Sequence, residues 1–300
     1  MHFQLTEDQR ALQAGMRELL AGRFGRDTLR AAVDAPGTLD RGLWRKLGEA
    51  GFFALRLPED EGGVGLGLPE AVLLFEEAGR ALLPGPLIAT HLAAGVVKGA
   101  ADGSVIVTQP DGALVEWYEA ADALLPPADT AEGGFADGAL TPVRSVDPLT
   151  PLHRLPEPAP AADPLVGLLT AAEQLGSAAR TTEMAVQYAR EREQFGAAIG
   201  SFQAVKHLCA QMLARTELAR SAVYAAAVTC EAADIAGAKL LADEAAVRCA
   251  RDCLQVHGGM GFTWEADVHL HLKRAWVRKE RWVSEGALTE LLAELLVEVG

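Results

Sequence analysis

The sequence predicts a mainly α-helical protein with a small β segment in its middle. Apolar residues recur at intervals of three and four over residues 1–100 and again over 163–300, which is the pattern of amphipathic helices. Between these stretches, residues 101–162 are rich in glycine and proline and contain two short strand-like runs. Half of the 300 residues are hydrophobic, enough to bury a large core. We therefore expect an N-terminal α-helical domain, a truncated middle β segment with its linker, and a C-terminal four-helix bundle.

Four helices are expected in the N-terminal region. Thr6 can cap the first, since a threonine hydroxyl accepts hydrogen bonds from the first turn and two acidic residues follow it. The others are expected over about residues 40–51, 69–81 and 87–97.

The middle segment and the C-terminal region differ sharply in pattern. Residues 104–108 and 112–117 read as short strands, and the proline-rich stretch 156–160 reads as a linker. Four apolar stripes then predict four long helices, at residues 165–179, 205–223, 242–256 and 288–299. Their alanine-rich seams favour a close-packed bundle, which is also suited to oligomerisation.

Composition excludes several functional classes. A net charge of −14 and a pI near 5.0 repel nucleic acids and anionic membranes. No apolar run approaches the roughly 20 residues of a membrane span, and the first residues lack a signal-peptide pattern, so we expect a cytoplasmic protein. The cysteines do not form a metal-binding pattern and are expected to be buried thiols: Cys209, Cys230, Cys249 and Cys253.

Three stretches carry information beyond a generic helical protein. The first reads YAREREQFG at 188–196 and IGSFQAVKH at 199–207, the second reads QVHGGMGFTWE at 255–265, and the third reads WRKLGEAGF at 44–52 and LPEDEGGVG at 57–65. Each resembles a signature of the acyl-CoA dehydrogenase family, in the family's order and spacing. The resemblance covers residues 1–100 and 163–300, about four-fifths of the chain.

The chemistry of these motifs suits a dinucleotide. An arginine at a helix end beside a glycine turn can grip a phosphate, and paired glycines let backbone approach a ligand closely. The resemblance implies that a set of residues contacts FAD bound mainly by a neighbouring subunit: Arg192, Gln194, Phe195, Gln203, Gln255, Gly258 and Gly259. Other readings stay open. Arg192 could pair with an adjacent glutamate on the surface, the two glycines could simply end a helix, and His257 could be a packed histidine rather than a base.

The sequence also departs from the family. The family's middle β-barrel is far longer than residues 101–162, and its flavin-binding strand motifs are missing here. The family's two positions for the catalytic glutamate correspond to Val166 and Trp282, and neither is acidic. Glu285 is a candidate base if the register has shifted by one helical turn, and otherwise a solvated helix residue. A basic cluster on 273–281 could be a solvated face, paired in part with Glu280, or a phosphate site.

Taken together, the resemblance implies a subunit of a flavin-dependent acyl-CoA dehydrogenase that catalyses α,β-dehydrogenation of an acyl-CoA thioester. Shortened subunits of this kind occur in heteromeric (α2β2) actinobacterial enzymes for steroid side chains. A full-length acyl-CoA dehydrogenase-like partner would then supply the flavin-ring site and the base. The alternatives are a catalytically silent structural subunit, or a homo-oligomeric enzyme redeployed in biosynthesis.

Overall fold

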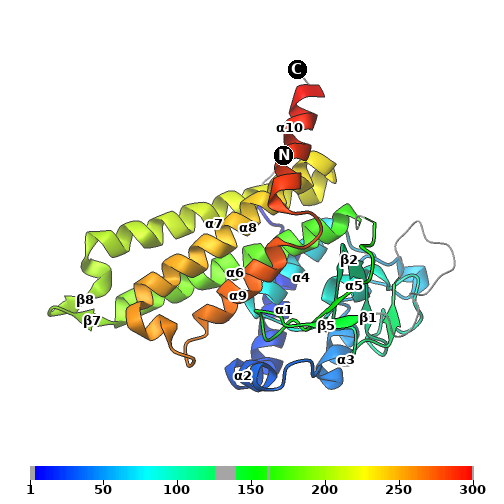
Figure 1. The fold of residues 1–300 in the computed structure, drawn as a ribbon, viewed down its shortest axis with the longest axis horizontal. Helices are drawn as coiled ribbons and strands as arrows, with labels where there is room; N and C mark the ends of the chain where they lie inside the picture. Colours follow the sequence, from blue (N-terminus) through cyan, green and yellow to red (C-terminus); the bar gives the residue numbers. More distant parts are fainter. Residues whose placement is uncertain (1–3, 126–139, 161–162, 299–300) are drawn as a thin grey trace.

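The computed structural model describes residues 4–125, 140–160 and 163–298, and it is mainly helical (Figure 1). The N-terminal region contains five α-helices and a 3₁₀ turn: α1 (Glu7–Arg23), α2 (Arg26–Asp34), α3 (Arg41–Glu49), η1 (Glu59–Glu61), α4 (Leu68–Arg80) and α5 (Leu87–Leu92).

Local sequence signals explain most of these boundaries. The backbone N–H of Gln9 donates to the Thr6 hydroxyl (3.1 Å), and the Gln9 side chain accepts from the Thr6 N–H (3.0 Å), so α1 starts with a capping box. Helix α2 was not predicted, because it is only nine residues long and buries only Leu29 and Val33, too few apolar positions to mark a helix. Helix α5 ends five residues earlier than expected, at Leu92.

The middle segment forms a small β region. Its strands are all two or three residues long: β1 (Val107–Thr108), β2 (Pro110–Asp111), β3 (Leu114–Glu116), β4 (Ala123–Leu124), β5 (Thr141–Val143) and β6 (Leu152–Arg154). Strands β2, β3, β6 and β5 make an antiparallel sheet in that order, and β1 pairs with β4 in parallel. The predicted strands at 104–108 and 112–117 are therefore present but shorter.

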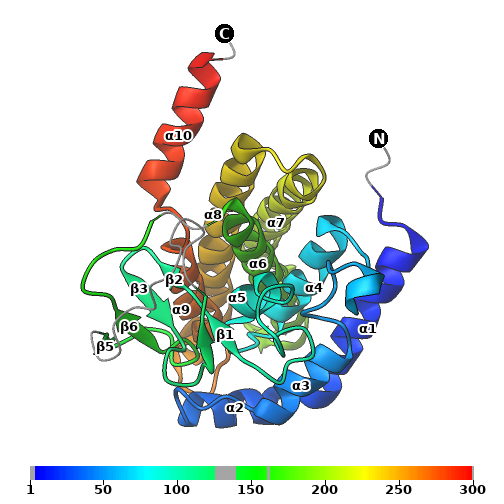
Figure 2. The same cartoon turned by 90° about the vertical axis from the view of Figure 1, so that its right-hand side faces the viewer.

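The C-terminal region contains the long helices and two small links. Its elements are α6 (Pro164–Glu191), β7 (Glu193–Gln194), β8 (Ala197–Ala198), η2 (Ile199–Ser201), α7 (Gln203–Thr229), α8 (Ala232–His257), η3 (Gly258–Phe262), α9 (Val268–Lys279) and α10 (Glu285–Glu298). Helices α6, α7 and α8 pack lengthwise, and α9 lies against α8 and α6. Helix α10 extends away from the body, with α8 as its main contact (Figures 1 and 2). Within the described ranges, no helix has the length and apolar character to cross a membrane.

The N-terminal and C-terminal regions share one hydrophobic core, and α4 packs against α6. Two glycines make this crossing possible. A Cβ added to Gly79 would overlap the Glu173 carbonyl group, and one added to Gly176 would overlap the Glu76 carbonyl group. The two helix backbones are therefore in direct contact, which fixes α6 relative to the N-terminal helices.

The three arginines of the basic cluster at 273–281 are buried. For these arginines, the solvated face and the phosphate site are therefore both wrong. Arg274 pairs with Asp147, and Arg278 Nη1 donates to Glu116 Oε2 at 2.8 Å. Arg281 lies 3.0 Å from Asp111 and 2.7 Å from Glu116. These carboxylates belong to the middle segment, so the arginines attach that segment to α9. A sequence pattern shows that arginines share a face but not what covers it.

The expectation of four buried thiols also needs correction. Cys249 and Cys253 are buried, but Cys209 is half-buried and Cys230 is exposed. Cys230 is the residue that ends α7, with a φ of 57°. A residue in that left-handed turn lies outside the helical stripe, so the periodicity that buries its neighbours does not apply to it.

Candidate functional site

The predicted flavin-contacting residues of the first motif lie at one end of the helical bundle. Arg192 ends α6, and the chain then turns back through the β7–β8 hairpin, which projects from the body (Figure 1). Phe195 stands at the hairpin turn with a φ of 55° and a 95% exposed surface. Gln203 is the first residue of α7 and is also exposed.

The residues of the second motif lie where α8 ends. Gly258 terminates α8 with a φ of 58°, a value that glycine adopts without strain. The reading of these glycines as a helix end is therefore confirmed. A Cβ added at Gly258 or Gly259 would meet no atom within 4 Å, so the backbone there faces open space. The Gln255 side chain, one turn before the end of the helix, is exposed.

A ring contact brings the two motifs together. The Tyr188 ring of α6 stacks on the His257 ring of α8, with centroids 4.1 Å apart and planes 21° apart. His257 Nδ1 lies 2.8 Å from the Cys253 carbonyl oxygen, which fits the packed histidine rather than a general base. Because Tyr188 is one turn before Arg192, the structure places all seven predicted residues at the same end of the bundle.

Several hydrogen-bond donors at this end have no protein partner. In the described part of the chain, the Arg192 guanidinium has no hydrogen bond or ion pair, and Glu191 instead accepts from Gln187 at 3.0 Å. The Gln194 amide donates only to the adjacent Glu193 carbonyl oxygen, at 2.8 Å. Exposed donors beside an open glycine turn are suited to bind the phosphate oxygens or the polar ring edges of a dinucleotide.

Exposed aromatic residues lie in the same sequence motifs as these donors, and of them only Phe195 was predicted to contact a ligand. Phe262 is 76% exposed and Trp264 is 55% exposed, in the segment directly after the glycine pair. Phe195 meets Phe202 edge to face, with centroids 6.1 Å apart. The signal was available in the sequence, since these residues follow the glycine pair without any periodicity that would bury them. Clustered exposed aromatic residues are typical of an interface.

The family's positions for the catalytic glutamate are filled by apolar side chains. Val166 is fully buried in α6. The Trp282 indole lies against Gly167, and the backbone N–H of Trp282 donates to the Asp111 carboxylate at 2.9 Å. Neither of these side chains can accept a proton from a substrate.

The carboxylates closest to this region belong to a buried ion-pair network. Burial alone would raise the pKa of Glu116, but Arg281 and Arg278 outweigh it and lower that pKa below its usual range. Glu173 is also buried, and burial raises its pKa although Arg278 Nε lies 2.8 Å from its Oε2. These side chains are enclosed by protein, so they attach the middle segment to the bundle rather than face a substrate.

Glu285 lies at the first residue of α10, with its side chain 59% exposed and 2.5 Å from Lys279 Nζ. This environment matches the solvated helix residue rather than a base shielded from water, because proton abstraction next to a thioester needs a dry site. Its role as a base stays a prediction that requires a covering partner.

Comparison with known proteins supports the resemblance. The family profile "Acyl-CoA dehydrogenase, N-terminal domain" matches residues 6–102, and "Acyl-CoA dehydrogenase, C-terminal domain" matches residues 168–280. The acyl-CoA dehydrogenase IpdE2 of Mycobacterium tuberculosis is 35% identical, covering 90% of this chain and 91% of its own. FadE34 of the same organism is 34% identical over 86% of this chain but only 44% of its own length.

Solved structures agree. The ChsE4–ChsE5 complex from Mycobacterium tuberculosis gives a TM-score of 0.87 at 26% identity, covering 99% of both chains. The Tcur3481–Tcur3483 steroid acyl-CoA dehydrogenase gives 0.83 at 26% identity, covering 97% of this chain and 98% of the other. The chain therefore belongs to the acyl-CoA dehydrogenase family of FAD-dependent oxidoreductases.

Proposed function

We propose that this chain is a shortened subunit of a heteromeric acyl-CoA dehydrogenase and contributes one half of an FAD site to a full-length partner. One observation carries the proposal. The donors at the bundle end are exposed, and Arg192 is unpaired in the described part of the chain, whereas Val166 and Trp282 fill the positions of the base. The chain thus retains a face that can reach a neighbour's flavin and has no carboxylate at the positions of its own base.

In this proposal each retained residue has a definite task. The Arg192 guanidinium binds phosphate oxygens, and the Gln194 and Gln255 amides donate to the dinucleotide. Gly258 and Gly259 let the backbone approach it without a Cβ in the way. When bound, FAD supplies the acceptor for the β-hydride of the acyl-CoA thioester, and the partner supplies the base for the α-proton.

The relatives support a partner of the same fold. Two similar solved structures each pair two named components, ChsE4–ChsE5 and Tcur3481–Tcur3483, and the second is a steroid acyl-CoA dehydrogenase. In FadE34 the matching stretch is only 44% of a longer chain. We therefore propose an α2β2 assembly that acts on the acyl-CoA of a bulky lipid such as a steroid side chain.

A catalytically silent structural subunit is the rival function, and the filled base positions favour it. It differs from the proposal in one respect, since a purely structural subunit gains nothing from the exposed guanidinium of Arg192, which is unpaired among the described residues. The homo-oligomeric enzyme would need its own flavin-ring site, and the strand motifs that the family uses for it are missing from residues 101–162.

Flavin retention by the complex decides between the FAD half-site and the silent structural subunit. The chain is co-expressed with a full-length acyl-CoA dehydrogenase encoded beside it, and the flavin absorbance of the purified complex is measured per partner chain. Arg192→Gln should lower flavin retention by at least about tenfold, because a charge-assisted phosphate contact is lost. Arg190→Gln, an exposed arginine two residues earlier on α6, is the matched control.

Equal flavin content in the wild-type, Arg192→Gln and Arg190→Gln complexes would leave the structural subunit as the better account. A full flavin band in this chain purified alone would instead show that it holds FAD without a partner.

A further inference from the structure

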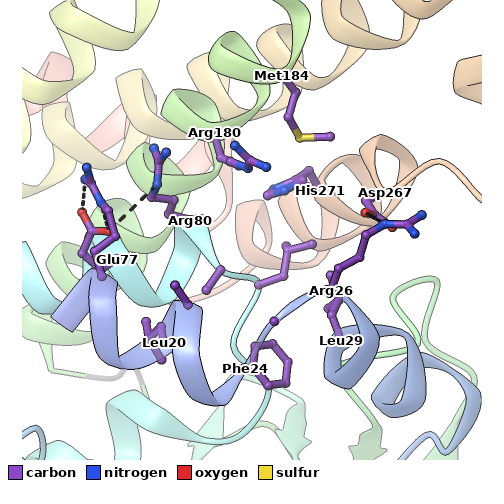
Figure 3. Close-up of a pocket in the computed structure, with 15 residues that line it drawn as sticks. Leu20, Phe24, Arg26, Leu29, Glu77, Arg80, Arg180, Met184, Asp267 and His271 are labelled. Atoms are coloured by element: carbon purple, nitrogen blue, oxygen red, sulfur yellow. Dashed lines mark hydrogen bonds and ion pairs between the residues drawn. The ribbon is translucent and has the colours of Figure 1, made fainter. Parts of the chain in front are cut away.

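A cavity of about 340 Å³ lies among α1, α2, α4, α6 and α9, away from the proposed FAD face (Figure 3). Its nearest point on α6 is Met184, which lies eight residues before Arg192. At 1.5 Å per residue, these two positions are about 12 Å apart along the helix. The cavity is therefore separate from the donors assigned to the flavin.

The cavity has an apolar wall and a basic rim. Leu20, Phe24 and Leu29 line it from α1 and α2, and Met184 lines it from α6. Figure 3 shows these side chains facing the same space as His271 and a set of arginines. The arginines come from four different elements: Arg17, Arg26, Arg80 and Arg180.

The charge around the cavity is positive in a strongly acidic protein. Four arginines line it against two carboxylates, Glu77 and Asp267. Their partners outside the lining, Arg30 and Glu183, bring the totals to five arginines and three carboxylates, an excess of two positive charges. The chain as a whole carries −14, so this local excess runs against its composition.

Three of the four lining arginines are occupied by carboxylates. Arg17 makes two hydrogen bonds to Glu77, at 2.6 and 2.8 Å. Arg26 lies 2.8 Å from Asp267, and both oxygens of Glu183 accept from Arg80.

Arg180 is the lining arginine whose charge is not matched. Its carboxylate contact is to Glu183, at 3.6 Å, and that carboxylate is already held by Arg80. In the part of the chain that the structure describes, the Arg180 guanidinium makes no hydrogen bond. An arginine with free donors at the edge of a partly apolar cavity is suited to a carboxylate ligand.

His271 supplies a second donor in the same cavity. Its ring is buried, and its Nδ1 lies 2.9 Å from the Ser177 hydroxyl oxygen, while Nε2 has no hydrogen-bond partner among the described residues. Burial, followed by the charges of Arg180, Arg274 and Arg80, lowers the pKa of His271 to about 3. The ring is therefore neutral at physiological pH. With the Ser177 hydroxyl donating to Nδ1, the proton is on Nε2 and can be donated to an anion.

We propose that this cavity binds a small amphipathic carboxylate. Its carboxylate accepts hydrogen bonds from Arg180 and from Nε2–H of His271, and its apolar body lies on Leu20, Phe24 and Met184. A carboxylate with an apolar body fits better than inorganic phosphate, because much of the lining is apolar and offers phosphate oxygens no partner. This site goes beyond the proposed FAD half-site and does not depend on it.

Calorimetric titration of the purified chain with three probes tests the site. The probes are 4-phenylbutyrate, its neutral amide and inorganic phosphate. We expect 4-phenylbutyrate to bind at least about tenfold more tightly than either of the others. Arg180→Gln should weaken 4-phenylbutyrate binding by about tenfold or more, whereas Arg248→Gln, an exposed arginine paired with Glu244 on α8, should leave it unchanged.

A second variant tests the same site independently, in case Arg180→Gln does not fold. Met184→Glu keeps Arg180 but places a like charge in the cavity, so it should also weaken 4-phenylbutyrate binding. The proposal is overturned by equal binding of the acid and its amide, by phosphate binding as tightly as the acid, by the absence of binding for all three probes, or by unchanged binding in Met184→Glu and Arg180→Gln. None of these outcomes bears on flavin retention, so the two proposals can fail independently.

Discussion

The indole ring of Trp282 lies directly on the backbone of Gly167, so closely that a Cβ added at residue 167 would overlap the ring. Trp282 holds this position with a φ of 67°, and its backbone N–H donates to the carboxylate of Asp111 in the middle segment. The contact joins the first turn of α6 to the segment after α9. The family resemblance places the catalytic base at Val166 or Trp282, and both positions hold packed apolar side chains in this chain.

The first prediction follows from this contact. Gly167→Ala should lower the free energy of unfolding by about 1–3 kcal/mol, because the added methyl group forces the indole or the helix to move. Gly237→Ala is the matched control on α8, where an added Cβ meets no atom within 4 Å. It should raise stability by about 0.5–1 kcal/mol through helix propensity. Urea unfolding followed by tryptophan fluorescence measures both, and a gain of stability in Gly167→Ala would contradict the contact.

The second prediction concerns Arg278, which is buried between Glu116 and Glu173. Arg278→Met should cost about 3–5 kcal/mol, because it leaves the buried carboxylate of Glu173 without its cation, while Glu116 keeps Arg281. Arg248→Met, which removes an exposed pair with Glu244, should change stability by less than about 0.5 kcal/mol.

A double variant isolates the cause of that loss. Glu173→Gln added to Arg278→Met should cost less than the sum of the two single changes, since the carboxylate left unpaired has been removed. Strict additivity in urea unfolding would mean that the Arg278 effect comes from lost packing rather than from charge.

Much of the fold was predictable because it depends on short-range signals. The capping box at Thr6 and the long apolar stripes gave the positions of α1, α6, α7 and α8. The glycine pair and Arg192 belong to contiguous motifs, so their identity could be assigned without knowledge of the packing. Their gathering at one end of the bundle also follows from the order of the helices.

The remainder depends on contacts between residues far apart in the sequence. Arg274 and Asp147 are 127 residues apart, and Arg281 and Asp111 are 170 apart, so helical spacing could not identify their partners. The apolar stripe of α10 predicted a bundle helix, but the structure places this helix away from the body. An apolar stripe shows that a face needs a partner and does not say which surface provides it.

The third prediction concerns thiol reactivity. Burial raises the pKa of Cys249, and it raises the pKa of Cys253 to about 12, so both thiols are protonated and enclosed. Cys230 is exposed at the end of α7 and should react first with a disulfide reagent. Titration with 5,5′-dithiobis(2-nitrobenzoate) should show a fast thiol that Cys230→Ser removes, while Cys249 and Cys253 react only on unfolding. A fast phase that persists in Cys230→Ser would contradict the assignment.

The fourth prediction is a loss of stability in mild acid. Burial lowers the pKa of His91 to about 4, and burial with nearby arginines lowers that of His271 to about 3, against 6.5 in the unfolded chain. Between these pKa values the unfolded chain binds more protons than the folded chain does. Each neutral histidine therefore favours the folded state fully above pH 6.5, and its contribution to the free energy of unfolding is lost as the pH falls. At about pH 4.5 each loss is about 2–3 kcal/mol.

Urea unfolding at several pH values between 7 and 4.5 measures this dependence. The double variant His91→Gln/His271→Gln should have a shallower slope of stability against pH than the wild type, whatever its stability at pH 7, because two proton-binding sites of the unfolded chain are gone. His207→Gln, which changes an exposed histidine on α7, should keep the wild-type slope. An unchanged slope in the double variant would mean that both rings remain able to take up protons in the folded protein, and carboxylates would then have to account for the acid sensitivity.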